Sequence, residues 1–169
     1  MSSGLDLVRA LERIRRETPV THAYLTYGRY DFVAIVKATD LNEVSLLVRD
    51  IRRDGAIDTV TQIAGGAHVG INFVKPGRER DPVSAFILVK MGAFKSLRSL
   101  KTELMSIEPI AEAHSVFGVA DIMLCAKKTS YDTFFNQVFV PLRGLARFGI
   151  SSSSTLLTVE PQPQKSASG

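Results

Sequence analysis

Apolar positions along the chain change from helical to extended spacing and back again. One set recurs every three or four residues and predicts an amphipathic helix: Leu5, Val8, Leu11 and Ile14. Two extended apolar runs follow, residues 20–27 and 30–38, and the Gly28-Arg29-Tyr30-Asp31 segment between them predicts a hairpin turn. A second helical set comes next: Val44, Leu47, Val48 and Ile51. Gly55 is expected to end that helix, and residues 59–64 predict a further strand.

The same order of elements returns 90 residues later, where Gly118 corresponds to Gly28 and Asp121 to Asp31. Pro109 likewise corresponds to Pro19, and each proline is expected to stop the helix before it. The second copy has two helical sets: Leu97, Leu100, Leu104 and Ile107, then Phe134, Phe135, Val138, Leu142 and Leu145. Its extended runs are residues 110–117, 120–127 and 153–159. Chemically distinct residues keep one offset without a gap, which predicts an internal repeat.

An extra apolar run, residues 84–91, precedes the first helix of the second copy. Residues 84–160 therefore predict β-α-β-β-α-β, the split βαβ or ferredoxin-like plan. The first copy has no room for a leading strand, but the Gly65-Gly66 pair predicts a hairpin that would bring residues 67–74 beside 59–64. We predict an α+β fold of two tandem ferredoxin-like units, the first circularly permuted as α-β-β-α-β-β. The predicted parts are residues 1–76, a linker at 77–83, residues 84–160 and a loose tail at 161–169.

Composition and the pattern of apolar runs indicate in which compartment the protein is found and whether it associates with a membrane. The single cysteine, Cys125, excludes an internal disulfide framework and fits a reducing environment. The N-terminus lacks the apolar core of a signal peptide, and no apolar run approaches the roughly 20 residues that span a bilayer. We therefore expect a cytoplasmic protein without membrane association. Pro141, within the last helical set, is expected to kink that helix because proline lacks an amide donor.

Charge and reactive residues point away from nucleic acid and from catalysis. The net charge is +4, but lysine and arginine are scattered over predicted helix faces and the linker, so we expect no direct nucleic-acid binding. His22, His68 and His114 fall one to each predicted strand without metal-ligand spacing, and Cys125 has no evident base. We expect no metal, no cofactor and no enzymatic activity. A small α+β-barrel enzyme remains the less favoured alternative.

The order of elements around the Gly-x-x-Asp turns resembles the effector-binding (RAM) domain of the Lrp/AsnC family of transcription regulators. The matching segments are VTHAYLTYGRYDFVAIVKA with GAIDTVTQIA, and IAEAHSVFGVADIMLCAKK with GISSSSTLLTVE. The resemblance implies two tandem copies without the helix-turn-helix that family members usually carry. It further implies a stand-alone amino-acid-sensing module that forms at least a dimer and acts in transcriptional or metabolic regulation, alone or with a DNA-binding regulator of the family.

The chemistry of a free amino acid suits the two turns. An aspartate can accept hydrogen bonds from the ligand ammonium, and amides at the glycine can donate to its carboxylate. The resemblance adds nearby hydroxyls from the last strand of each copy. The candidate ligand-binding residues are Gly28, Tyr30, Asp31, Thr59, Thr61, Gly118, Asp121, Ser153 and Thr155. Two alternatives stay open: the aspartates bond only their own turns, or the chain is a ligand-independent protein–protein interaction module.

Overall fold

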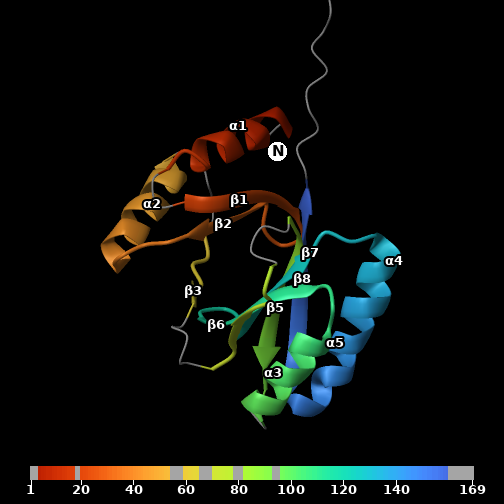
Figure 1. The fold of residues 1–169 in the computed structure, drawn as a ribbon. Coiled ribbons are helices and arrows are strands. Elements are labelled where there is room, and N and C mark those ends of the chain that lie inside the picture. Colours follow the sequence, from red (N-terminus) through yellow and green to blue (C-terminus); the bar gives the residue numbers. More distant parts are fainter. Residues whose placement is uncertain are drawn as a thin grey trace, which may run out of the picture. The chain divides into compact units, whose positions relative to one another are not determined.

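The computed structural model describes residues 4–17, 20–53, 59–64, 70–77, 82–92 and 96–159. The chain divides into two compact units, residues 1–59 with 158–169 and residues 60–157. Each combines helices with antiparallel strands, so the predicted α+β class is confirmed (Figure 1). Several expectations fall outside the described residues: Pro19 and Gly55 as helix stops, most of the predicted linker, and the tail.

The first unit is built on a hairpin of β1 (Val20–Tyr27) and β2 (Phe32–Val36). Helices α1 (Gly4–Ile14) and α2 (Leu41–Arg53) form over the two apolar sets predicted as helices. Leu11 and Ile14 of α1 pack with Ala23 of β1 in a small core, against which Ile51 of α2 also packs. The guanidinium of Arg15 donates two hydrogen bonds to the Ala23 carbonyl, at 2.9 and 3.1 Å, and so fastens the end of α1 to the hairpin.

From β5 (Val83–Met91) onward the chain has the element order β-α-β-β-α-β that the sequence predicted for residues 84–160. This part comprises β5, α3 (Leu97–Ser106), β6 (Ile110–Phe117), β7 (Ile122–Lys127), a helical run over residues 131–148, and β8 (Ile150–Val159). The strands lie in the order β8-β5-β7-β6, and each neighbouring pair is antiparallel. Apolar side chains of α3 and of the helical run cover one face, where Val89, Leu104, Leu124 and Val138 belong to one buried core.

The helical run changes its winding along its length. It begins as α4 (Tyr131–Phe134), widens into the π-helical turn η1 (Phe135–Phe139), and continues as α5 (Val140–Gly144) and the 3₁₀ turn η2 (Leu145–Phe148). The wide turn ends two residues before Pro141, whose missing N–H interrupts regular α-helical bonding. Gly149, with φ of 100°, ends the run in the left-handed conformation.

Residues 59–74 pair differently from the sequence prediction. β3 (Ile63–Ala64) and β4 (Asn72–Val74) both pair antiparallel with β6, at successive positions along that strand. The predicted pairing of residues 67–74 with residues 59–64 is therefore wrong, while Gly65, Gly66 and residues 67–69 lie outside the described residues. A Gly-Gly pair indicates a turn but not the partner of the strands that flank it. Here both strands pair with the edge of β6 that β7 leaves free. Ile71, between them in the chain, is fully buried in the core of the second unit.

Candidate functional site

The two Gly-x-x-Asp turns have the same backbone conformation. Gly28 and Gly118 have φ values of 143° and 151°, which favour glycine. In each copy the N–H two residues before the glycine donates to the carbonyl of the aspartate, Asp31 or Asp121, at 2.9 Å. The turn is therefore one structure formed twice.

The hairpins around the turns also agree residue by residue. Leu25 pairs with Phe32 in the first hairpin, and Ser115 pairs with Ile122 in the second, an offset of 90 in both strands. Each hairpin shifts register at the corresponding place, between Val20 and His22 and between Ile110 and Glu112. The repeat predicted from the sequence is thus confirmed for both hairpins.

Asp31 is exposed, and its side chain takes no part in holding the turn. Within the described part of the chain, its carboxylate has no hydrogen bond and no ion pair. The turn is closed instead by the hydroxyl of Thr26, which donates to the Tyr30 carbonyl at 2.6 Å. The hydroxyl of Tyr30 is buried without a hydrogen-bond partner, while the Arg29 guanidinium lies 5.7 Å from the centre of the Tyr30 ring. The first turn therefore has an exposed acceptor without a partner and a buried hydroxyl without a partner.

Asp121 is half-buried, and its polar groups are engaged by the fold. Its carboxylate accepts a hydrogen bond from the backbone amide of Met91 at 2.7 Å. Its own amide donates to the carbonyl of Val89 at 2.9 Å. The second aspartate joins β7 to the end of β5, which is a structural role in this turn.

Gln62 covers the second turn, and the sequence pattern gave no sign of this contact. Its Oε1 accepts from the amide of Ala120 at 3.4 Å, and its Nε2 is buried without a partner. A Cβ added at Gly118 would lie 2.7 Å from the same Oε1 atom. A carboxamide of the chain thus lies where a ligand carboxylate was expected to meet the turn.

The candidate hydroxyls of the first copy lie outside the predicted strand. Thr59 precedes β3 and its hydroxyl accepts a hydrogen bond from Nε of Arg52 at 2.9 Å. Thr61 is exposed and belongs to the second compact unit, whereas Thr59 belongs to the first. No hydrogen bond joins Thr59 to Asp31 within the described residues.

The candidate hydroxyls of the second copy lie on β8. Ser153 pairs with Val89 and Thr155 with Ile87 across the β5–β8 ladder. Directly paired residues share a face of a sheet, so both hydroxyls lie on the face that the helices cover. Ser153 is exposed and Thr155 half-buried there. The carboxylate of Asp121, by contrast, bonds at the end of β5 on the side of β7.

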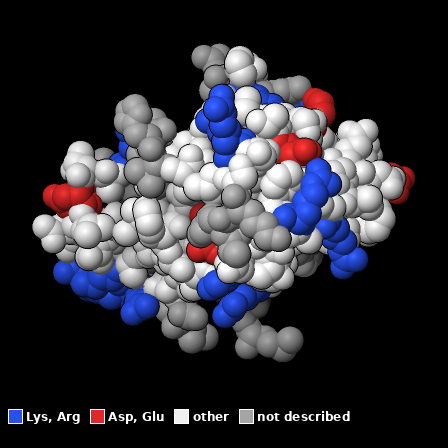
Figure 2. Space-filling model, turned by 90° about the horizontal axis from the view of Figure 1, so that it is seen from below, with Lys and Arg blue, Asp and Glu red and all other residues white. Residues whose placement is uncertain are grey.

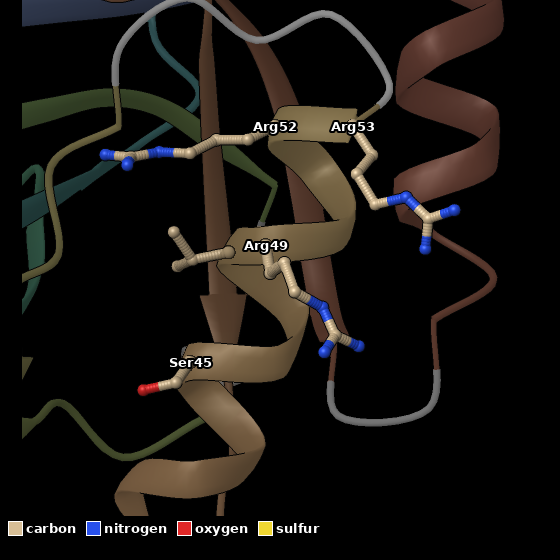
Figure 3. Close-up of a pocket in the computed structure, with 5 residues that line it drawn as sticks. Ser45, Arg49, Arg52 and Arg53 are labelled. Carbon is tan, nitrogen blue, oxygen red and sulfur yellow. The ribbon is translucent and has the colours of Figure 1, made fainter.

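A shallow hollow lies on the surface of α2. It is lined by Ser45, Val48, Arg49, Arg52 and Arg53. Figure 3 shows Arg52 extending to one side of the helix and Arg49 and Arg53 to the other, so their guanidinium groups do not converge. In Figure 2 lysine and arginine side chains appear in small separate groups. This arrangement is typical of a solvated helix face rather than of an anion site.

The reactive side chains are bonded or buried. His114 has both ring nitrogens engaged, Nδ1 with Oδ1 of Asn72 and Nε2 with Oε2 of Glu112, each at 3.2 Å. Burial, and secondarily the charge of Glu112, raises the pKa of the Cys125 thiol well above its ordinary value. His68 lies outside the described residues. Across the residues the structure describes, no three His, Cys, Asp or Glu side chains are grouped to hold a metal ion.

Comparison of the chain with protein-family models, with curated proteins and with solved structures found no match. Among the described residues, none of the helices is long and apolar enough to cross a membrane. Any function must therefore be argued from the site itself.

Proposed function

We propose that the chain is a stand-alone sensing module of the Lrp/AsnC type that binds a free amino acid at the Gly28–Asp31 turn. It would act in transcriptional or metabolic regulation through self-association or through a partner regulator. The observation that carries the proposal is the exposed, unpaired carboxylate of Asp31. In the second turn, by contrast, the carboxylate of Asp121 is bonded to the backbone amide of Met91.

The groups of the first turn suit the two charged ends of an amino acid. Asp31 would accept from the ammonium, and a charge-assisted hydrogen bond of this kind contributes about 1.5–3 kcal/mol. Amides at Gly28 would donate to the carboxylate. The hydroxyl of Tyr30 is buried without a partner, and it would donate to the carboxylate if binding turned the ring outward. Thr59, which belongs to the same compact unit, is proposed to add a hydroxyl from the following segment.

The proposed site is confined to the first copy. In the second copy Met91 bonds the aspartate and Gln62 covers the turn, so its polar groups already have partners within the chain. We propose that the second unit is a ferredoxin-like domain in which the second Gly-x-x-Asp turn has a structural role only. Its element order and the strand order β8-β5-β7-β6 support that assignment.

A ligand-independent interaction module is the second candidate. Large apolar side chains exposed on the helical run of the second unit favour it, because contiguous patches of this kind mark contact surfaces. A small α+β-barrel enzyme is less favoured. A buried thiol is a poor nucleophile, and His114 is already bonded at both nitrogens.

Calorimetric titration of the full chain with each standard amino acid tests the proposal, with melting curves recorded in parallel. A ligand present at a hundred times its dissociation constant raises the free energy of unfolding by roughly 2.7 kcal/mol. We expect one amino acid, or a chemically related group, to release or absorb heat and raise the melting temperature. If no amino acid does so at millimolar concentration, the sensing proposal fails and the interaction module is favoured.

A further inference from the structure

Three aromatic rings stack in series along the helical run of the second unit. The ring centres of Tyr131 and Phe135 are 6.5 Å apart, and those of Phe135 and Phe139 are 5.4 Å apart. The guanidinium of Arg143 lies 4.8 Å from the centre of the Phe139 ring and extends the series by one more step. We call Tyr131, Phe135 and Phe139 the aromatic stripe.

Two rings of the aromatic stripe are exposed, those of Tyr131 and Phe135, while Phe139 is half-buried. Tyr131 is 74% exposed and Phe135 44% exposed, and Val140 beside them is 51% exposed. Other apolar residues of the run, such as Val138 and Leu142, are buried against the sheet. Within the second unit, no other element covers the outer side of α4 and α5 (Figure 1). Phe135, which the sequence pattern grouped with the apolar face, therefore lies outside it.

The π-helical turn keeps the rings in line. In a regular α-helix each residue advances by about 100°, so positions eight apart, such as Tyr131 and Phe139, drift by about 80°. A π-helical turn advances less per residue and reduces that drift. The turn over Phe135–Phe139 thus holds the third ring against the second. This stacked arrangement forms a pre-ordered apolar surface.

The two ends of the stripe are complementary to each other. Asp132 is exposed at the start of the run, and Arg143 is exposed near its end. If two such helices crossed antiparallel about their midpoint, Asp132 would lie opposite Arg143. Phe135 would then meet the exposed Val140.

We propose that the aromatic stripe is a docking surface for a second copy of this chain, in an antiparallel, two-fold arrangement. A two-fold interface requires one surface to be complementary to itself, and the charges of Asp132 and Arg143 meet that condition. Each ion pair would occur twice in the dimer and fix its direction, while the aromatic rings would supply apolar contact. The proposal is independent of amino-acid binding.

Sedimentation equilibrium of the full chain tests this proposal through a charge exchange. Asp132→Arg and Arg143→Asp should each weaken self-association about tenfold, because each reversal places like charges together twice per dimer. The double variant D132R/R143D restores opposite charges and should associate within about threefold of the wild type. Phe135→Glu should remove this association step altogether. Circular dichroism and melting curves establish that each variant is folded.

Three results would overturn the proposal. The first is a wild type that stays monomeric at high concentration. The second is a folded single reversal or Phe135→Glu variant that associates as well as the wild type, and the third is a double variant as weak as the single ones. Stacked rings beside an arginine also suit single-stranded nucleic acid. A monomeric wild type that binds oligo(dT), with binding lost in Phe135→Ala, would assign the surface to that partner instead.

Discussion

The carboxylate of Asp121 accepts a hydrogen bond from the backbone amide of Met91 at 2.7 Å. The corresponding carboxylate, that of Asp31, has no partner within the described part of the chain. The cause lies in the strands beside each hairpin. β7 has β5 on its other edge, whereas β2 pairs only with β1 among the described strands. The same turn therefore occurs twice. Only in the second copy does the end of a neighbouring strand, β5, supply an amide that the aspartate can accept from.

The two aspartates should differ in their effect on stability. Asp121→Ala leaves the Met91 amide without its acceptor, which should lower the free energy of unfolding by about 1–2 kcal/mol. Asp31→Ala removes an exposed, unpaired group and should change it by less than about 0.5 kcal/mol. Urea unfolding of both variants measures this difference. Equal losses in the two variants would mean that Asp31 also has a structural role.

Gly118 should be sensitive to substitution for two separable reasons. Its φ of 151° strains any other residue, at a cost of about 1–3 kcal/mol, and a Cβ would also press on Gln62. Gly118→Ala should therefore lower the free energy of unfolding. Adding Gln62→Ala to that variant should restore the part of the loss that comes from the contact between the new Cβ and Gln62. A double-mutant cycle in urea measures the coupling, for which about 0.5 kcal/mol or more is expected. Strict additivity would argue against the contact between Gln62 and the turn.

The sequence predicted the elements better than their partners. Local spacing was enough for both hairpins, because turn and strands are adjacent in the chain and the two copies support each other. It was not enough for residues 59–74, because their partners on β6 lie 38 to 42 residues from β4 and 52 to 54 residues from β3 along the chain, and no local pattern indicates them. The contact of Gln62 with Ala120 was missed for the same reason. The asymmetry of Asp31 and Asp121 likewise depends on which strand lies beside each hairpin.

Ile71 tests the corrected pairing of this segment. Its side chain is fully buried in the core of the second unit, and its amide donates a hydrogen bond to the Ser115 hydroxyl at 2.8 Å. Ile71→Ala should lower the free energy of unfolding by about 2–5 kcal/mol. Val74→Ala, at a position 41% exposed in β4, is the matched control and should cost less than about 1 kcal/mol. Similar small effects for both would contradict the placement of Ile71 in that core.

Cys125 should make stability fall at alkaline pH. Burial raises the pKa of the thiol in the folded state, so the unfolded chain loses this proton first as pH rises above the ordinary thiol value of 9.0. Above that pH the folded state binds more protons than the unfolded state, and stability declines by up to about 1.4 kcal/mol per pH unit from this group. Urea unfolding from pH 8 to 10 should show a shallower decline in Cys125→Ala. Parallel declines would contradict the buried, protonated thiol.

The most direct test of the sensing proposal is calorimetric titration of Asp31→Asn beside Asp121→Asn, with the amino acid that the wild type binds. We expect Asp31→Asn to weaken binding at least tenfold, or about 1.4 kcal/mol, because it loses the charge facing the ligand ammonium, while its melting curve stays unchanged. Asp121→Asn keeps an oxygen that can accept from Met91, so it should fold and bind with the wild-type affinity. Wild-type affinity in Asp31→Asn, or a loss confined to Asp121→Asn, would contradict a site at the first turn.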